Sequence, residues 1–531
     1  MTTEAELRAQ IGQLIIVRAS GHLFDRQIRY PAWEAPAATL QRWLSEDNIG
    51  GVILLGGSPA EVALRTRQLQ SWAATPLLVA ADIEEGVGHR FPGATWFPPP
   101  LALSALGDRA AARDLAITMG ATTAREALAM GINWLLGPVV DVNNNPDNPV
   151  INVRAFGETA ATVSDLATAF IQGCQRQPIL TTAKHFPGHG DTATDSHLEL
   201  PVLPHADARL AAVELEPFRA AIAAGVDTVM SAHLLIPAWD ADQPATLSSA
   251  ILTGQLRDRL GFQGLIVTDA LLMGGITQCG SPGEVCVRAL AAGADMLLMP
   301  VDLPGAIAAI VAAVQSGQLP EARIQSALAR VKAAKAKVAR QPEAALTAAD
   351  LATFDDPSSN ATVAAILQAS QRQHGRLPLS LPTLQPPRLN LVAVGNRFNC
   401  PGLDIAAPAL AVPRRHGFET HLCEQAQLDC WQPPASQVLL QIFMRGDPFR
   451  GSASLSPAAQ DLFKRLLTEG QLLAIATYGS PYIDHWFGNW LPSALPRLFT
   501  YGQMPAAQAA IMAALWEPLS TPDVTSAATF I

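Results

Sequence analysis

The chain has 531 residues, more than the roughly 250 to 300 at which a single hydrophobic core stops growing, so we expect two domains. Apolar residues make up 49% and charged residues only 15%, a composition that excludes an intrinsically disordered protein. The 36 basic and 46 acidic side chains give a net charge of −10, which argues against nucleic acid as a partner.

The sequence predicts a cytoplasmic location. Residues 1–13 include Glu4, Glu6 and Arg8 and do not have the basic start, apolar run and small-residue cleavage site of a signal peptide. No apolar run reaches the roughly 20 residues that a membrane span needs, so we expect no membrane partner. The six cysteines form no CxxC pair and no dense framework, which is typical of reduced thiols.

From Gln13 onward, short apolar runs alternate with longer amphipathic stretches, a pattern that indicates repeated βα units and a parallel sheet. The predicted strands are Leu14–Val17, Gly51–Leu54, Leu77–Ala81, Ile132–Leu136, Ile179–Ala183, Asp227–Ser231, Leu265–Thr268 and Asp295–Met299. Predicted crossover helices include Glu61–Trp72, Arg109–Met130, Ala206–Ala224 and Ser249–Leu260. We therefore expect residues 1–340 to form a catalytic (β/α)8 TIM-like barrel, ending with a helix over Glu321–Arg340.

The rest of the chain is predicted to contain a connector and a smaller domain. Residues 341–387 lose strand character and accumulate prolines, namely Pro378, Pro382, Pro386 and Pro387. Residues 388–531 alternate again, with predicted strands at Leu389–Val394, Val438–Phe443 and Leu472–Thr477 and predicted helices at Pro457–Leu467 and Ala506–Trp516. This pattern predicts a C-terminal three-layer α/β domain.

Polar clusters follow the predicted strands of the barrel, where active sites of that fold lie. Asp82 follows the third strand, residues 141–154 the fourth, residues 184–197 the fifth, His233 the sixth and Asp269 the seventh. We expect these side chains to converge at one end of the barrel.

The stretch from Lys184 to His197, KHFPGHGDTATDSH, concentrates three histidines and several charged residues in one predicted loop. Such a concentration of titratable groups favours a functional site over a surface network. A metal site is a second interpretation of the loop, because five of its residues are of types that bind metal ions: His185, His189, Asp191, Asp195 and His197. Because the loop has no HExxH or HxH spacing, we interpret it as a site without metal.

Two further motifs are ambiguous by themselves. Asp269 ends an apolar strand, and an aspartate in that position is about as often a helix N-cap as a functional group. The segment Asp82–Arg90 gathers acidic groups and an arginine, which surface ion pairing would explain as well as ligand binding.

Together these motifs resemble glycoside hydrolase family 3, and within it the β-N-acetylglucosaminidases that recycle peptidoglycan fragments. The motif KHFPGHGDTATDSH is typical of that subgroup, because family β-glucosidases share the Lys-His but are not expected to carry the distal Asp-Ser-His. The similarity covers roughly residues 7–340 and includes Asp269, the segment Asp82–Arg90 and the run NVRAFG at residues 152–157. Gly479–Tyr482 is a weaker match to the family's second domain.

Two departures from the family pattern concern the edge of the pocket. The pattern DxEGG is replaced by Asp82-Ile83-Glu84-Glu85-Gly86, and Ala270 stands where an acidic residue often follows the nucleophile.

The resemblance implies a role for each matching position. Asp269 corresponds to the nucleophile, His197 to the general acid/base and Asp195 to its orienting partner. Sugar-binding positions correspond to Asp82, Arg90, Arg154, Lys184 and His185. The implied activity is that of a retaining β-N-acetylhexosaminidase, which removes terminal N-acetyl-β-D-glucosamine and needs neither cofactor nor metal.

These residue types suit the chemistry. A retaining glycosidase needs one carboxylate to attack the anomeric carbon and one acid to protonate the leaving oxygen. Histidine, with an ordinary pKa of about 6.5, exchanges protons readily near neutral pH, and a neighbouring aspartate can hold its tautomer. The Gly- and Thr-rich loop between Lys184 and His197 is predicted to close over bound sugar.

Other functions remain open at this point. A phosphorylase is possible because a histidine acid/base does not repel incoming phosphate as a carboxylate would. A β-glucosidase of the same family is a second alternative. A catalytically silent sugar-binding protein on the same fold is a third. All of them predict a small carbohydrate as the partner.

Overall fold

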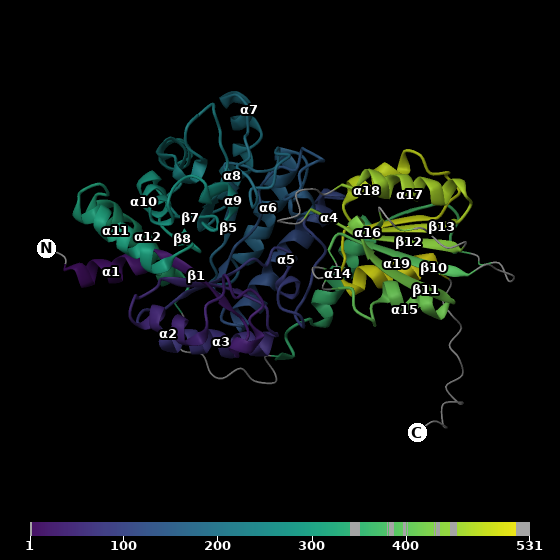
Figure 1. The fold of residues 1–531 in the computed structure, drawn as a ribbon, viewed down its shortest axis with the longest axis horizontal. Helices are drawn as coiled ribbons and strands as arrows, with labels where there is room; N and C mark the ends of the chain where they lie inside the picture. The colour runs from purple at the N-terminus through teal and green to yellow at the C-terminus, as the bar shows by residue number, and fades with distance from the viewer. Residues whose placement is uncertain are drawn as a thin grey trace, which may run out of the picture. The chain divides into compact units, whose positions relative to one another are not determined.

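The computed structural model describes residues 3–339, 351–379, 381, 387–396, 400, 402–428, 431, 436–446 and 454–516. The chain divides into two compact units (Figure 1). The first unit comprises Met1–Ile366 with Gly446–Ala453, and the second comprises Leu367–Arg445 with Ser454–Ile531.

The first unit is built on eight parallel strands: β1 (Ile15–Ser20), β2 (Gly51–Leu55), β3 (Leu78–Ala81), β4 (Trp134–Leu135), β5 (Thr182–Phe186), β6 (Thr228–Ser231), β7 (Leu265–Thr268) and β8 (Leu297–Leu298). They form one sheet in the order β4-β3-β2-β1-β8 and a second in the order β5-β6-β7. Single parallel bridges join the sheets, Trp134 with Leu180 and Val267 with Met296. The result is a curled parallel sheet, and each predicted strand overlaps an observed one.

Helices accompany the strands of this sheet. They are α1 (Glu4–Gly12), α2 (Ala37–Ser45), α3 (Pro59–Trp72), α4 (Leu101–Ser104), α5 (Arg109–Ala129), α6 (Ala160–Cys174), α7 (Asp207–Ala212), α8 (Leu215–Ala223), η5 (Ala250–Arg259), α9 (Gly274–Thr277), α10 (Pro282–Ala292), α11 (Leu303–Gln315) and α12 (Glu321–Lys337). Helix α3 begins where the Ser58 hydroxyl accepts the Glu61 N–H and Pro59 takes the first position. Short strands therefore alternate with helices, as the sequence pattern predicts.

Two predicted elements of this unit differ from the structure. The predicted helix Ala206–Ala224 is split into α7 and α8, because Pro217 has no N–H to continue a helical ladder from Val213. Strand β5 extends to Phe186, although the prediction ended it at Ala183 and assigned Lys184 and His185 to a loop. Lys184 and His185 fit inside this buried strand because both side chains have buried carboxylate partners.

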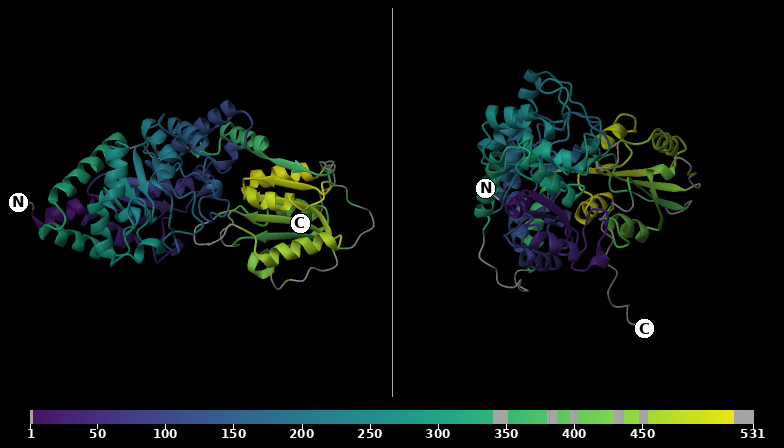
Figure 2. Two further views of the ribbon diagram at one scale, coloured as in Figure 1. Left: turned by 90° about the horizontal axis from the view of Figure 1, so that it is seen from above. Right: turned by 60° about the vertical axis from the view of Figure 1, so that its left-hand side comes forward.

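The second unit contains a six-stranded sheet in the order β11-β10-β12-β13-β14-β9. Its strands are β9 (Arg372–His374), β10 (Arg388–Val394), β11 (Phe418–Glu424), β12 (Gln437–Met444), β13 (Leu472–Gly479) and β14 (Arg497–Thr500). One apolar cluster packs one face of the sheet against α16 (Gln425–Leu428), α17 (Pro457–Thr468) and α18 (Pro481–Gly488). A second cluster packs the other face against α15 (Pro408–Arg415) and α19 (Pro505–Leu515). These three layers are visible in Figures 1 and 2.

The segment predicted as a connector, residues 341–387, contains regular structure. Helix α14 spans Pro357–Ser370, and β9 pairs antiparallel with β14. Strand β9 consists of three exposed polar residues, so it has no apolar alternation that a sequence pattern could detect. Pro382 and Pro386 of the predicted connector lie outside the described residues.

Across the part of the chain that the structure describes, none of the helices combines the length and the apolar character needed to cross a membrane.

Candidate active site

The ends of the strands in the first unit carry the predicted site residues. Asp82 directly follows β3, Lys184 lies within β5, and Asp269 directly follows β7. Asp195 and His197 lie in the segment between β5 and α7. Because all the strands are parallel, their C-terminal ends lie at one edge of the curled sheet, where the sequence places the site.

Four side chains at this edge form what we call the ion cluster: Asp82, Glu84, Arg154 and Lys184. The Lys184 Nζ donates to Asp82 Oδ1 at 2.7 Å and lies 2.6 Å from Glu84 Oε1. Arg154 donates through Nε and Nη2 to the two oxygens of Glu84, both at 2.8 Å. Glu84 and Lys184 are buried, so the cluster contains paired charges removed from water.

Pairing outweighs burial in setting the charge of this cluster. Burial raises the pKa of Glu84, but Arg154 and Lys184 hold it well below its usual range. Burial lowers the pKa of Lys184, but the charges of Asp82 and Glu84 raise it above its ordinary value. These shifts favour the anionic form of Glu84 and the cationic form of Lys184. This environment disfavours the protonated form of Glu84, which a proton donor would need.

Arg90 and His185 flank the ion cluster. The Arg90 Nε donates to the backbone carbonyl of Asp82 at 3.1 Å. The His185 Nδ1 lies 2.8 Å from Asp141 Oδ2, and Asp141 also accepts the backbone N–H groups of His185 and His189. Asp141 is fully buried. It thus fixes both the imidazole of His185 and the path of the chain as it leaves β5.

Asp269 is a half-buried carboxylate surrounded by histidines. Its Oδ1 accepts the backbone N–H of Ala270 at 2.7 Å. Burial raises the pKa of Asp269, but the charges of His185, His233 and His197 and the Ala270 bond lower it overall. The environment keeps this group ionised, which is the state that a nucleophile requires.

Asp195 and His197 form a hydrogen-bonded pair. The His197 Nδ1 lies 2.9 Å from Asp195 Oδ1, and the same oxygen accepts the His197 backbone N–H at 2.9 Å. Asp195 is 2% exposed, whereas the His197 side chain is 18% exposed. An aspartate that accepts from Nδ1 leaves Nε2 as the ring nitrogen that can exchange a proton.

The segment that carries this pair, residues 188–199, is called the acid/base loop below. It docks on the residues after β7, where Gly274 N donates to His197 O at 3.0 Å and Gly275 N donates to Ser196 O at 3.1 Å. A Cβ atom at Gly274 would lie 2.7 Å from Leu198 O, closer than real contacts allow. Glycine at this position thus lets the loop approach the segment that follows Asp269.

His189 holds the acid/base loop from inside. Its Nδ1 lies 2.8 Å from Thr192 Oγ1 and its Nε2 lies 2.8 Å from Ser196 Oγ. Burial lowers the pKa of His189 to about 4, and Asp141 opposes this effect only in part. A neutral imidazole can donate from one nitrogen and accept at the other, so both hydroxyl contacts suit the neutral ring.

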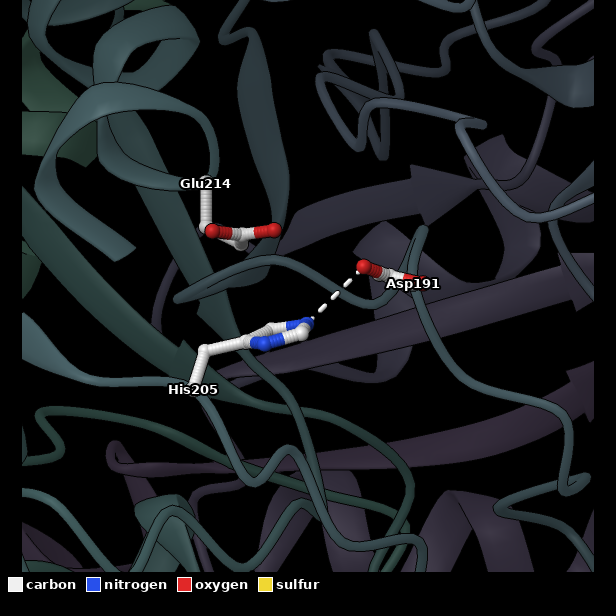
Figure 3. Close-up of side chains that lie close together, drawn as sticks. All are labelled: Asp191, His205 and Glu214. Carbon is white, nitrogen blue, oxygen red and sulfur yellow. Dashed lines mark hydrogen bonds and ion pairs between the residues drawn. The ribbon is translucent and has the colours of Figure 1, made fainter. Parts of the chain in front are cut away.

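Asp191 belongs to a different group. Its Oδ2 lies 2.9 Å from His205 Nε2 and accepts from Arg209 Nη2 at 3.1 Å, while Arg209 Nη1 donates to Glu214 at 2.6 Å. Figure 3 shows the carboxylates of Asp191 and Glu214 beside His205. The ligand atoms of these three lie within 4.8 Å of one another, as a metal site would require. Arg209, however, already supplies a cation to both carboxylates, so the group is an ion-pair network at the start of the acid/base loop.

Three contributors have no individual role in the prediction from sequence: Glu84, Asp141 and His233. Glu84 is the centre of the ion cluster, and Asp141 orients His185. His233 is fully buried after β6, with Nε2 3.1 Å from the carbonyl of Ala270. Each lies in or after a strand end that the sequence marks as polar, and that position was the available signal.

Comparisons with known proteins cover nearly the whole chain. Residues 6–334 match the Glycosyl hydrolase family 3 N terminal domain, and residues 383–517 match the Bacterial Glycosyl hydrolase family 3 C-terminal domain. The chain is similar to a β-N-acetylglucosaminidase/β-glucosidase of Cellulomonas fimi, with 34% identity over 63% of this chain and 61% of that protein. It is 33% identical to β-hexosaminidase A of Pseudoalteromonas piscicida, over 64% of this chain and 62% of that protein. The chain thus spans less than two thirds of these curated relatives.

A solved structure adds a match over nearly the full length. A family 3 β-N-acetylglucosaminidase from Paenibacillus sp. str. FPU-7 superposes with a TM-score of 0.78 and 32% identity, covering 95% of both chains. The fold and the two family matches define a two-domain α/β protein of the glycosidase type. The chain belongs to glycosyl hydrolase family 3. The family predicted from the motifs is therefore confirmed, and the names of these relatives agree with the predicted subgroup.

Proposed function

We propose that this protein is a retaining β-N-acetylhexosaminidase that removes terminal N-acetyl-β-D-glucosamine residues, with peptidoglycan fragments as its substrate. The observation that carries the proposal is the docking of the Asp195–His197 pair on the segment that follows Asp269. An ionised carboxylate and a proton-exchanging group then serve one site. A double displacement requires that combination.

In the proposed mechanism, Asp269 attacks the anomeric carbon while His197 Nε2 donates a proton to the leaving oxygen. Water then attacks the glycosyl ester, and His197 takes the proton from that water. Asp195 holds Nδ1 and stabilises the imidazolium that forms in the second step. Neither metal nor cofactor has a part in these steps.

The ion cluster is proposed to hold the sugar. Asp82 and Glu84 occupy two of the three N–H donors of Lys184 among the described residues, so the third can donate to a sugar hydroxyl. Asp82 is partly exposed and can accept from another hydroxyl. Arg90, Arg154 and His185 complete the set of proposed contacts. Charge-assisted bonds from a rigid cluster fix the anomeric carbon relative to Asp269.

We also infer that the curled sheet closes as a (β/α)8 barrel. The bridges at both junctions of the two sheets support this inference, as does the backbone bond from Leu135 N to Leu180 O at 2.8 Å. A closed ring would hold the ends of β3, β5 and β7 in constant register around the sugar.

A panel of nitrophenyl glycosides in phosphate buffer tests the proposed function. We expect cleavage of the N-acetyl-β-glucosaminide well above that of the β-glucoside, with free sugar as the product and no turnover by Asp269→Ala. A preference for the β-glucoside would identify a β-glucosidase instead. Formation of sugar 1-phosphate would identify a phosphorylase. Equal sugar release by wild type and Asp269→Ala would contradict an enzymatic role for this site.

A further inference from the structure

Asn148 lies in the segment that follows β4, and its fully buried side chain contacts the acid/base loop. The side-chain nitrogen Nδ2 donates to the backbone carbonyls of His189 at 2.8 Å and Gly190 at 3.0 Å. The same nitrogen lies 3.4 Å from Thr192 Oγ1. A Cβ atom at Gly190 would lie 1.8 Å from the carbonyl oxygen of Val142, so glycine is needed for the loop to come this close. Asn148 therefore holds the beginning of the acid/base loop.

The oxygen of the same amide holds the segment that leads to the ion cluster. Asn148 Oδ1 accepts the backbone N–H groups of Val150 at 2.9 Å and Ile151 at 2.7 Å. The Val150 carbonyl in turn accepts from Arg154 Nη1 at 3.1 Å, while the other guanidinium nitrogens of Arg154 bind Glu84. An amide has two N–H donors and an oxygen that accepts two hydrogen bonds, so these contacts use its full capacity. One side chain thus joins the acid/base loop to the ion cluster.

Hydrogen bonds connect the residues that Asn148 holds with the proposed acid, His197. The imidazole of His189 lies 2.8 Å from Thr192 Oγ1 through Nδ1 and 2.8 Å from Ser196 Oγ through Nε2. The Thr192 hydroxyl also donates to the His189 carbonyl at 3.1 Å. Ser196 directly precedes His197 in the chain. A shift of His189 would therefore displace the residue next to the acid.

We propose that Asn148 is a positioning residue for proton transfer, which places His197 relative to the sugar that the ion cluster holds. Its Nδ2 fixes the start of the loop that carries the acid, and its Oδ1 fixes the segment that carries Arg154. Asn148 itself takes no part in the bond changes. This inference rests on the proposed function, because it takes His197 as the acid of that site. A misplacement of about 1 Å at a reacting group can cost about 10²-fold in rate, so a remote amide of this kind matters for catalysis.

The substitution Asn148→Asp separates the two functions of the amide. At pH 8 a carboxylate keeps an acceptor for the N–H groups of Val150 and Ile151, but it has no N–H to donate and repels the carbonyl oxygens of the acid/base loop. The segment that carries Arg154 then keeps its bonds, whereas the loop that carries the acid does not. Proton donation matters for a sugar leaving group and little for nitrophenolate. We therefore expect a loss that depends on the leaving group.

The test measures kcat/KM of the full chain at pH 8 for N,N′-diacetylchitobiose and for nitrophenyl N-acetyl-β-glucosaminide. We expect Asn148→Asp to lose about 10- to 10²-fold on the disaccharide and less than about 3-fold on the aryl glycoside. Asn148→Ala removes both ends of the amide and should add a loss that the two substrates share.

Asn133→Asp is the matched control, because Asn133 is another asparagine of the first unit whose amide joins two backbone segments. Its Nδ2 donates to Leu77 O at 3.2 Å and its Oδ1 accepts the Val79 N–H at 2.8 Å. Asn133 directly precedes β4, at the opposite end of that strand from Asn148. This variant should leave the ratio of the two kcat/KM values unchanged.

Equal losses on both substrates in a folded Asn148→Asp variant, or no loss on the disaccharide, would overturn the positioning role while the proposed function stands. The same leaving-group dependence in Asn133→Asp would also overturn it, because the effect would then follow from any weakening of the first unit. If the aspartate variant does not fold, the smaller and neutral Asn148→Ser should show the leaving-group dependence, and equal losses there would overturn the role. Failure of the wild type to cleave either substrate would instead contradict the proposed function, and the positioning role with it.

Discussion

The ion cluster and the acid/base loop serve one proposed site with opposite physical designs. In the ion cluster, Glu84 lies between Arg154 and Lys184, which stabilise its anionic form through short hydrogen bonds and ion pairs. In the acid/base loop, His197 has one ring nitrogen held by Asp195, its side chain remains partly exposed, and backbone bonds dock the loop. Binding a neutral sugar needs charges that do not change. Proton transfer needs a side chain that can gain and lose a proton and that is accessible to the substrate.

The largest expected effect concerns proton transfer by His197 of the acid/base loop. Replacing His197 with Ala should slow glycosylation of a disaccharide by roughly 10²- to 10⁴-fold and affect an activated aryl glycoside much less, because nitrophenolate departs with little proton assistance. Asp195→Asn should show a milder version of the same pattern. Single-turnover measurements with both substrates check this.

His205→Ala is the matched control for that experiment, since His205 is another aspartate-paired histidine in the first unit and has no proposed part in proton transfer. Equal losses on both substrates in His197→Ala would show that His197 acts only in binding or structure.

For the ion cluster, we expect a loss of kcat/KM that does not depend on the leaving group. Glu84→Gln removes the anion between the buried Lys184 and the partly buried Arg154, so we expect kcat/KM to fall by about 10²-fold for disaccharide and aryl glycoside alike, because the sugar is misplaced in both. Glu126→Gln is the control, because Glu126 is a fully buried carboxylate of the same unit bonded to Thr95 and not to the ion cluster. A leaving-group dependence in Glu84→Gln would mean that Glu84 takes part in proton transfer.

The smallest expected effect concerns the support of the loop by His189. The pKa of His189 falls from 6.5 to about 4 in the folded loop, so an opened loop binds more protons between these pH values. The closed loop is therefore most stable relative to the opened loop above pH 6.5. That stability is lost as pH falls toward about 4, at about 1.4 kcal/mol per pH unit and about 3 kcal/mol in total.

Hydrogen exchange of residues 188–199, corrected for the intrinsic pH dependence of exchange, measures this contribution. Wild type and Ser196→Ala should lose protection over that pH range, because both keep the imidazole, whereas His189→Gln should not. The same slope in His189→Gln would assign the proton uptake to another group.

The predictability of these regions from sequence follows the physical origin of each. The eight strands of the first unit overlap short apolar runs, so their approximate positions can be predicted from the sequence, and helix α3 falls on a predicted amphipathic stretch. Strand β5 was predicted three residues too early because Lys184 and His185 resemble loop residues until their partners are known. Strand β9 is exposed and polar, and no local pattern marks it. Contacts between residues that are distant in sequence cannot be predicted from the pattern of any one segment.

The candidate site divides in the same way. The motif that carries Asp195 and His197 is contiguous, and its pairing at a separation of two residues is local. The role of Glu84 depends on Arg154 and Lys184, which lie 70 residues or more away in sequence, so no spacing rule could assign it. The same holds for Asp141 with His185. Local contacts were predictable from the sequence, and long-range pairing needed the fold.

The central claim is that Asp269 forms a covalent bond to the sugar while His197 supplies and removes the proton. A slowly hydrolysed fluorinated N-acetylglucosaminide analogue, followed by proteolysis and mass spectrometry, tests it most directly. We predict a glycosyl ester on the peptide that contains Asp269, with overall retention of anomeric configuration in the normal reaction. A label on a different carboxylate, or inversion of configuration, would contradict the account.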